Sequence, residues 1–222
     1  MIEKGVFITG TDTGVGKTWF TVTLMEALKR EGHQTAGMKP IACGATYING
    51  KLINDDASLI MQHCSQPTDY ELINPVVFEL PVAPNIAANC ANKTVALEQI
   101  VASYRQLAAG SEKVVVEGVG GWRVPISNKI STVDLVRELS LPVIMVVGMR
   151  LGCINHALLT AEAIKADGMD LCGWVSNQLE NDSPYKREVI ATLKERLACP
   201  HIAEFPYTEG FEPEKMLKSI NF

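Results

Sequence analysis

The chain has 222 residues, 47% of them hydrophobic, so it can bury a sizeable core, and we expect one domain spanning residues 1–222. A formal net charge of −5, with acidic and basic residues interspersed, argues against a nucleic-acid-binding surface, which would carry a basic patch. No apolar run approaches the ~20 residues that span a bilayer, and because the N-terminus leads directly into an apolar strand we expect no signal peptide. We therefore expect no membrane association and a cytoplasmic location. Six scattered cysteines without a C-x-x-C pair indicate reduced thiols rather than a disulfide framework or a zinc site.

Apolar runs and helical patterns alternate along most of the chain. In chain order we expect a strand at 5–9, a helix at 17–30, a strand at 34–39, a polar loop at 41–55, a helix at 56–63, an irregular proline-containing stretch at 65–92, a helix at 94–108, a strand at 113–117, a helix at 132–139, a strand at 142–147, a helix at 155–166, a strand at 171–176, a helix at 184–197, a strand at 201–205 and an irregular end with a short amphipathic segment. The strands are continuously apolar, which is typical of strands covered on both faces. This order predicts an α/β fold with a doubly wound, mostly parallel sheet.

A phosphate-binding loop is indicated between the first strand and the first helix, where residues 10–18 read G-T-D-T-G-V-G-K-T. Glycines let backbone N–H groups turn toward a polyphosphate, and the helix N-terminus and Lys17 add positive charge, while the Thr18 hydroxyl can bind Mg²⁺. The standard spacing would put the first glycine at position 11, but Thr11 stands there and Gly10 precedes it. The loop predicts a P-loop nucleoside triphosphatase-like domain. A glycine-rich turn that merely ends in Lys-Thr is the alternative.

Residues that directly follow parallel strands meet at one edge of the sheet, which is where ligands bind in such folds. Glu117 ends an apolar strand, where an unpaired carboxylate is costly, so either Mg²⁺ shared with Thr18 or a neighbouring lysine must compensate its charge. Asp56 is a second candidate metal ligand, with helix capping as the alternative. Lys39 ends the second strand and could stabilise charge on a transferring phosphoryl group; an exposed lysine at a loop mouth is the alternative.

Two further segments follow strands. Asn155 is expected to begin a helix, and the preceding residues 151–154 would bring free N–H groups to its first turn, a site suited to a carboxylate. An ordinary asparagine cap with nothing bound is the alternative. Asn177-Gln178 stands where guanine-specific proteins carry Asn-Lys-x-Asp, but the lysine and aspartate are missing, so we expect no GTP specificity and a bond from Asn177 to adenine instead.

Six segments in order carry a resemblance to a known family: residues 9–18, 36–44, 54–57, 116–122, 151–160 and 173–177. Together they resemble the dethiobiotin synthetases, ATP-dependent ring-closing enzymes of biotin synthesis, and the displaced Gly10 is part of that likeness. The resemblance implies that CO₂ is taken up by one amine of 7,8-diaminopelargonate as a carbamate. The carbamate oxygen then attacks the γ-phosphate of ATP to give a carbamic–phosphoric anhydride. The second amine closes the ring, yielding dethiobiotin, ADP and phosphate.

The resemblance also implies roles for individual residues. Catalytic roles fall to Lys17, Lys39 and Thr13, and Mg²⁺ would be bound by Thr18, Asp56 and Glu117. The diamine would be bound by Cys43, Leu151, Gly152, Cys153 and Asn155, with residues 151–155 acting from the neighbouring subunit of a homodimer. The nucleotide-binding residues would be Gly14, Val15, Gly16, Lys17, Thr18, Trp19, Asp56, Glu117, Gly118, Val119, Gly120, Asn177, Gln178, Pro206, Tyr207, Thr208 and Glu214.

Two positions depart from the family pattern. Gly14 replaces the glutamate of some members, so no carboxylate at that position can act as general base, and Cys43 replaces the usual serine. Two other functions share parts of the pattern. A nucleotide-driven switch of the partitioning or cell-division type usually has a signature lysine early in the loop, where this chain has Asp12 or Thr13. A small-molecule kinase would stop at a phosphorylated product.

Overall fold

The computed structural model describes residues 4–181 and 184–220. Its main sheet is fully parallel, with strand order β10-β9-β8-β1-β7-β2. These strands are β1 (Gly5–Gly10), β2 (Thr35–Met38), β7 (Lys113–Glu117), β8 (Val143–Met149), β9 (Leu171–Gln178) and β10 (His201–Phe205). The expectation of no signal peptide concerns the N-terminus, and residues 1–3 lie outside the described part of the chain.

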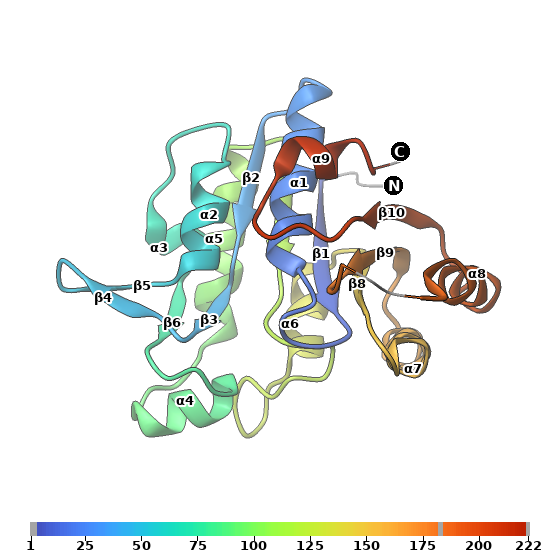
Figure 1. The fold of residues 1–222 in the computed structure, drawn as a ribbon. Coiled ribbons are helices and arrows are strands. Elements are labelled where there is room, and N and C mark those ends of the chain that lie inside the picture. Colours follow the sequence, from blue (N-terminus) through green and yellow to red (C-terminus); the bar gives the residue numbers. More distant parts are fainter. Residues whose placement is uncertain (1–3, 182–183, 221–222) are drawn as a thin grey trace.

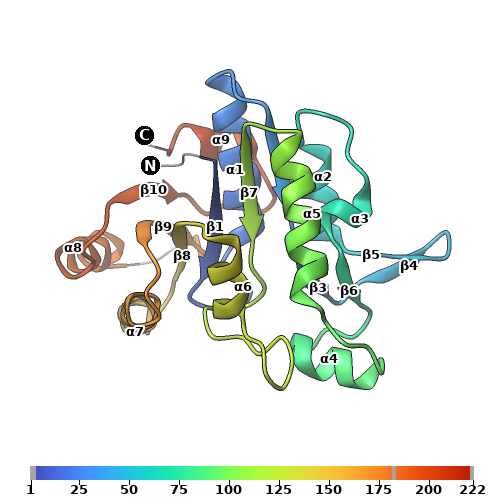
Figure 2. The same cartoon turned by 180° about the vertical axis from the view of Figure 1, so that it is seen from behind.

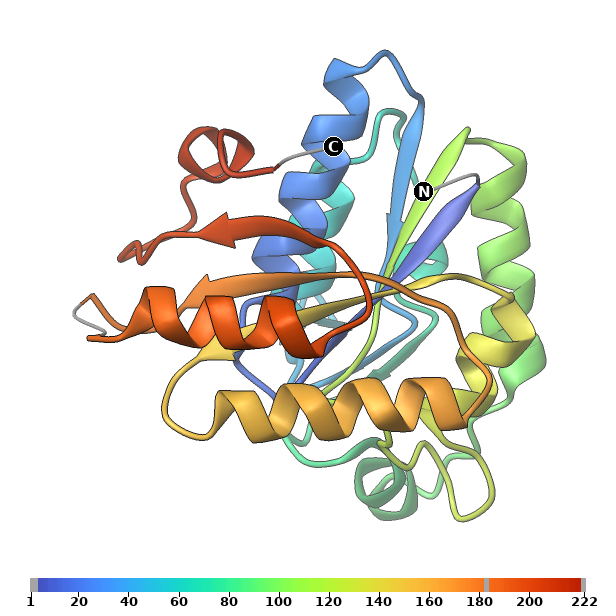
Figure 3. The ribbon, with the colours of Figure 1, turned by 90° about the vertical axis from the view of Figure 1, so that its right-hand side faces the viewer.

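Helices cover both faces of the sheet, which confirms the expected doubly wound α/β fold. In Figure 1, α1 (Lys17–Arg30), α2 (Asp55–Gln62) and α9 (Pro213–Leu217) lie in front of the sheet. Figure 2 shows α5 (Leu97–Ala109) and α6 (Thr132–Leu139) on the reverse. In Figure 3, α7 (Cys153–Ala166) and α8 (Lys186–Arg196) run side by side along the edge formed by β8, β9 and β10. None of the helices that the structure describes has the length and apolar character of a membrane span.

The central strands are buried because their residues are apolar on both faces. β1 lies between β7 and β8, where Phe7 pairs with Val116 on one side and Val143 on the other. All residues of β1 and β8 are buried. The same register sets Ile8 beside Glu117, so the carboxyl ends of β1 and β7 lie together. The phosphate loop and Glu117 are therefore neighbours.

The expected polar loop at 41–55 is wrong in part, because this segment contains three short strands. β3 (Ile41–Cys43) pairs in parallel with β6 (Val76–Phe78), and β4 (Thr46–Ile48) pairs with β5 (Lys51–Ile53) as an antiparallel hairpin that projects from the body in Figure 1. Three residues are too few to establish a periodic pattern. The turn did carry a signal, since Asn49 and Gly50 both have positive φ, 49° and 79°, as a type I′ hairpin requires.

The stretch 65–92, expected to be irregular, also contains α3 (Tyr70–Ile73) and α4 (Pro84–Cys90) besides β6. α3 is a single turn, and α4 begins at Pro84, a residue well suited to the first helical position. The prolines of this segment therefore punctuate short elements rather than exclude them.

Two boundaries differ in ways that affect the site. α7 begins at Cys153, with Gly152 as N-cap at φ 93°, so Asn155 lies inside the first turn and neither begins the helix nor caps it. β9 continues to Gln178, so Asn177 lies within the strand rather than after it. The start of α7 is set by the backbone conformation of Gly152, and the end of β9 is set by its pairing with β8 as far as Gln178. Neither end follows from side-chain type.

Candidate active site

A cavity of about 870 Å³ opens at the carboxyl edge of the sheet, where the ends of β1, β2, β7 and β9 meet the segment after β10. Segments far apart in the sequence meet there, as the strand order requires. Most of the site residues expected from the sequence line this cavity: Thr13, Gly14, Gly16, Lys17, Thr18, Trp19, Lys39, Cys43, Asp56, Glu117, Val119, Gly120, Asn177, Gln178, Tyr207 and Thr208.

The phosphate loop holds its lysine inward. Lys17 is 6% exposed, and its Nζ donates a hydrogen bond to the Asp12 carbonyl oxygen at 2.9 Å. Burial is the main reason that the pKa of Lys17 falls to about 8, although the nearby Glu117 opposes that shift. The Asp12 carboxylate accepts a bond from the Thr13 N–H at 2.7 Å and pairs with Arg150, and these contacts lower the pKa of Asp12 despite some desolvation. A phosphate group could replace the Asp12 carbonyl as the partner of Lys17.

Gly16, the N-cap of α1, requires glycine for two reasons. Its φ is 91°, in the left-handed region, and a Cβ there would lie 2.1 Å from Nδ2 of Asn177. That Nδ2 donates a hydrogen bond to the Val15 carbonyl at 2.9 Å. Asn177 therefore links β9 to the phosphate loop. Its other amide atom, Oδ1, has no hydrogen-bond partner among the described residues.

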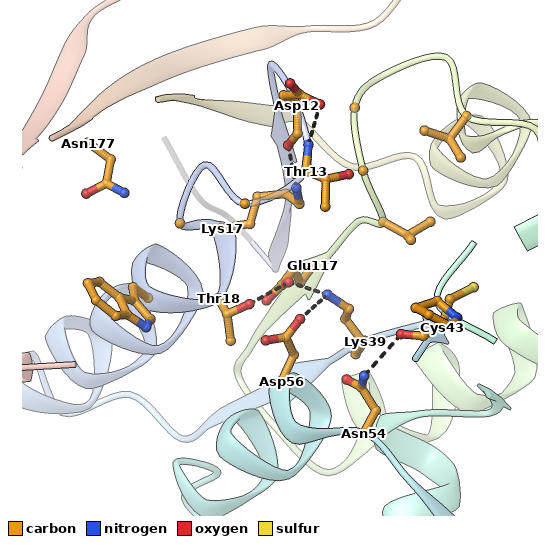
Figure 4. Close-up of a pocket in the computed structure, with 18 of the residues that line it drawn as sticks. Asp12, Thr13, Lys17, Thr18, Lys39, Cys43, Asn54, Asp56, Glu117 and Asn177 are labelled. Atoms are coloured by element: carbon orange, nitrogen blue, oxygen red, sulfur yellow. Dashed lines mark hydrogen bonds and ion pairs between the residues drawn. The ribbon is translucent and has the colours of Figure 1, made fainter. Parts of the chain in front are cut away.

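Lys39 lies at the centre of a second cluster, which Figure 4 shows on the far side of Lys17 from Asn177. Its Nζ pairs with Glu117 Oε1 and with Asp56 Oδ2, the latter at 3.0 Å. The Thr18 hydroxyl donates to the same Glu117 oxygen at 2.9 Å. The compensation of Glu117 by a lysine, one of the two alternatives drawn from the sequence, is thus present in the structure. The alternative of Lys39 as an exposed lysine is excluded, because Lys39 is only 5% exposed.

Charge pairing governs protonation in this cluster. Burial alone would lower the pKa of Lys39, but Glu117 and Asp56 together outweigh burial and raise it above its ordinary value. Burial likewise would raise the pKa of Asp56, and the Lys39 ammonium reverses that effect and holds the pKa below its usual range. The cluster therefore places a fixed positive charge between two carboxylates on the cavity wall.

The cluster also fits a magnesium ion. Glu117 is 1% exposed, and its Oε2 is buried without a hydrogen-bond partner among the described residues. A buried carboxylate oxygen with no donor is costly, and a hard cation satisfies it. Thr18 and Asp56 add oxygen atoms of the type that Mg²⁺ prefers. Within the described residues, no group of three or more His, Cys, Asp and Glu side chains forms a metal site, so the fit depends on the threonine and the two acids together.

Cys43 lies on the cavity wall beyond Lys39. Burial raises the pKa of its thiol to about 11, with a small opposing effect from Lys39, so the thiol stays protonated at neutral pH. It can therefore act as a weak hydrogen-bond donor, in the manner of the serine that it replaces, but not as a thiolate.

The other expected site residues lie outside the cavity lining. Val15 is buried beneath the phosphate loop, and a Cβ on Gly118 would meet the Phe7 ring at 2.8 Å, so both pack inward. Glu214 lies on α9, where its carboxylate pairs with Arg30 at 2.6 Å. The remaining residues that do not line the cavity are Pro206, Leu151, Gly152, Cys153 and Asn155.

The cavity also has lining residues that the motifs do not single out. Asp12 and Gly121 belong to the motif segments 9–18 and 116–122 but were not named as site residues; their place in those segments could have indicated that they line the cavity. Residues 81–84 form an apolar part of the wall and carried no local signal, because the β3–β6 pairing brings them there. The others are Asn54, Val124 and Leu179.

Sequence comparison decides the family. Residues 4–215 match a family profile described as "AAA domain". Proteins called "ATP-dependent dethiobiotin synthetase BioD" match nearly the whole chain. The protein from Xanthomonas axonopodis pv. citri is 46% identical over 211 residues, covering 95% of this chain and 94% of that protein. The protein from Xylella fastidiosa strain M12 is 46% identical over 223 residues, covering 100% and 98%, and that from Aromatoleum aromaticum is 42% identical over 214 residues, covering 96% and 95%. The chain belongs to the dethiobiotin synthetase family.

Solved structures with this fold include proteins of another functional class. A ParA family ATPase from Chlorobium tepidum has a TM-score of 0.55 at 12% identity, covering 98% of this chain and 90% of that one. A chain of the MinC:MinD cell division complex from Aquifex aeolicus has a TM-score of 0.56 at 12% identity, covering 97% and 85%. At such identities the likeness shows the P-loop ATPase fold alone. The assignment to a family therefore rests on the sequence relatives and not on these structures.

Proposed function

We propose that this chain catalyses the ATP-dependent conversion of 7,8-diaminopelargonate and CO₂ to dethiobiotin, with release of ADP and phosphate. The observation that carries the proposal is the meeting of the phosphate loop and the Lys39–Glu117–Asp56 cluster in one cavity. The membership of the family adds the reaction that such a cavity performs. This enzyme is a ligase that forms carbon–nitrogen bonds.

The reaction requires a group that stabilises negative charge on the carbamate and on the γ-phosphate of ATP while the two are held together. One amine of the diamine adds to CO₂ and loses a proton, giving a carbamate. A carbamate oxygen displaces ADP from the γ-phosphorus, and the second amine then attacks the carbamoyl carbon, closing the ring and expelling phosphate. Lys39 faces the cavity from β2 and Lys17 from the phosphate loop, so their ammonium groups can stabilise the carbamate and the transferring phosphoryl group.

We propose that Thr18, Asp56 and Glu117 hold Mg²⁺, with the orphaned Oε2 of Glu117 as the strongest indication. When bound, the ion would neutralise phosphate charge during transfer. The Lys39 ammonium holds the pKa of Asp56 below its usual range, which keeps that carboxylate in the ionised form that binds a cation.

The base of the nucleotide is proposed to bind beside Asn177, Gln178 and Thr208. Each has a buried polar atom with no partner among the described residues: Oδ1, Nε2 and Oγ1 respectively. Because Nδ2 of Asn177 is occupied by the Val15 carbonyl, Oδ1 is left as an acceptor, which suits the exocyclic amine of adenine. Tyr207 completes this part of the wall. ATP is therefore the proposed nucleotide.

The carboxylate of the diamine is proposed to bind at the first turn of α7, in a homodimer that completes each site across the interface. Gly152 caps this helix without a side chain, and although the Cys153 N–H donates to the Arg150 carbonyl at 3.0 Å, the N–H groups of Ile154 and Asn155 have no intrahelical acceptor and can bind an anion. Leu151 beside it is fully exposed, at 103%, as expected of a residue that another surface covers. We place the enzyme in the cytoplasm, where ATP is available.

Position 14 of the phosphate loop offers no side chain that could act as general base. Gly14 has a φ of 72°, and a Cβ built there would meet no described atom within 4 Å. The proton released by the attacking amine therefore passes to the departing phosphate or to water.

The test is product analysis with purified protein, ATP, Mg²⁺, bicarbonate and the diamine. We expect dethiobiotin by mass spectrometry and phosphate release that requires the diamine and bicarbonate together. A kinase would instead accumulate a phosphorylated diamine, and a switch ATPase would release phosphate at the same rate without the diamine. Either result would remove the proposed function.

A further inference from the structure

A chain of buried and partly buried hydrogen bonds joins the start of α2 to the backbone of Lys39. The Asn54 N–H donates to the Tyr70 hydroxyl at 2.8 Å, and that hydroxyl donates to Asn74 Oδ1 at 3.0 Å. Nδ2 of Asn74 donates in turn to the Lys39 carbonyl at 2.6 Å. Asp56 lies two residues after Asn54, so the chain of bonds connects the backbones that carry both members of the Lys39–Asp56 ion pair. We call Tyr70 and Asn74 the relay pair.

Asn74 of the relay pair and its neighbour Ile73 hold the backbone of Lys39 from both sides. Besides the bond to the Lys39 carbonyl, the Lys39 N–H donates to the Ile73 carbonyl at 2.8 Å, so the segment 73–74 binds both backbone groups of Lys39. Asn74 also donates to the Val76 carbonyl at 3.1 Å, which fixes its amide. Lys39 lies directly after β2 and before Pro40, which has no N–H, so the direction of Lys39 depends on these bonds rather than on strand pairing.

The Tyr70 hydroxyl performs both roles of a hydroxyl, acceptor and donor. Asn74 is 2% exposed and Asn54 is 8% exposed, so water does not readily replace the hydroxyl as their partner. Its loss would leave a buried N–H and a buried amide oxygen unsatisfied. Asn54 also caps α2, since its Oδ1 accepts the Ala57 N–H at 3.2 Å, so a shift of Asn54 would move the helix end that carries Asp56.

We propose that Tyr70 and Asn74 are positioning residues for the reaction. They hold Lys39 and the N-terminal turn of α2 in the register that places the Lys39 ammonium against Asp56 and Glu117. Neither residue lines the cavity, so each acts through Lys39 and Asp56 rather than by touching a substrate. The proposal is tested in two ways. Measurement of kcat depends on the proposed function, whereas chemical labelling of Lys39 does not.

The kinetic test compares Tyr70→Phe with Tyr104→Phe. Both remove one hydroxyl from a partly buried ring, but Tyr104 lies in α5, away from Lys39. Because small misplacements of a catalytic group cost rate, we expect Tyr70→Phe to lower kcat about tenfold and to leave KM for ATP within about twofold. Tyr104→Phe should leave both unchanged. Asn74→Leu, which removes the donor to the Lys39 carbonyl, should lower kcat further and provides the test from the other end if Tyr70→Phe does not fold.

The chemical test needs no catalysis. Native protein is labelled briefly with acetic anhydride, and acetylation of Lys39 is measured by mass spectrometry relative to Lys51, whose side chain is 69% exposed. Lys39 is only 5% exposed in the wild type, and loss of its positioning makes the ammonium more accessible to the reagent, so we expect several-fold more labelling of Lys39 in Tyr70→Phe than in wild type or Tyr104→Phe.

Unchanged kcat together with unchanged labelling, even with a lower melting temperature, would reduce the relay pair to a stabilising role and overturn the proposal. If the wild type formed no dethiobiotin, the proposed function would fail. The labelling result would then still decide whether the relay pair positions Lys39.

Discussion

Replacing Lys39 by methionine tests the central cluster of the site. Methionine has a similar length and no charge, so Lys39→Met leaves the Glu117 and Asp56 carboxylates without their shared partner. Removing one member of a buried ion pair costs about 3–5 kcal/mol. Glu117 is 1% exposed and bears the full cost, while the Asp56 side chain is 46% exposed and bears little. We therefore expect the low end of that range.

For a chain of 222 residues, each kcal/mol shifts the melting temperature by about 2–4 °C, so Lys39→Met should melt roughly 6–12 °C lower. Loss of a charge that stabilises the transition state should lower kcat by about 10²–10³-fold. Because the two carboxylates are freed, Mg²⁺ should recover part of the lost stability, and its effect on melting temperature should exceed the effect in wild type.

Differential scanning fluorimetry with and without Mg²⁺, and the rate of dethiobiotin formation, measure these effects. The matched control is Lys51→Met, which breaks the exposed Lys51–Glu71 pair and should leave the free energy of unfolding almost unchanged. A Lys39→Met protein that melts with the control and retains a near-normal rate would refute the role given to the cluster.

Three further predictions follow from single positions. Gly16→Ala should raise the Kd for ATP at least about tenfold, because its Cβ would displace Asn177 and because φ there is 91°; nucleotide titration by calorimetry measures this. Affinity for ATP should fall as pH rises through about 8, where Lys17 loses its proton, and Lys17→Arg should move that loss to higher pH. Burial lowers the pKa of His201 from 6.5 to about 4, so the folded state favours the neutral ring. The contribution of His201 to the free energy of unfolding should be complete above pH 6.5 and should decline toward pH 4, by about 1–2 kcal/mol once the partial exposure of the ring is allowed for. His201→Gln should flatten that decline.

Each of these predictions has a contradicting result. Normal ATP affinity in Gly16→Ala would mean that Asn177 and the phosphate loop do not share that contact. An affinity that is constant between pH 7 and 9 would mean that the Lys17 ammonium does not bind phosphate in the free enzyme. Equal acid sensitivity in wild type and His201→Gln would assign the decline in stability to other groups.

Much of the fold follows from the sequence because its central strands are apolar on both faces and alternate with amphipathic helices. The helices at 17–30 and 132–139 and the strand at 201–205 have the expected bounds. The short elements between residues 41 and 92 could not be found in this way. β3 and β6 exist because they pair with each other across the 32 residues between them, and no local pattern encodes that pairing.

The site followed from the sequence where function depends on residues at strand ends. Lys39, Glu117 and the phosphate loop converge because parallel strands end at one edge. The sequence could not decide whether a metal or a lysine compensates the charge of Glu117, because the direction of a side chain depends on packing. It also could not indicate that Tyr70 reaches Lys39, since that link passes through a one-turn helix and an asparagine amide.

The transfer of oxygen from CO₂ to phosphate tests the proposed reaction most directly. The protein is mixed with ATP, Mg²⁺, the diamine and freshly added ¹⁸O-labelled bicarbonate, and the released phosphate is analysed by mass spectrometry before the label exchanges with water. Attack of a carbamate oxygen on the γ-phosphorus predicts one labelled oxygen in each phosphate, formed together with dethiobiotin. Unlabelled phosphate would indicate attack by water, and a phosphorylated diamine would indicate a kinase; either would contradict the account.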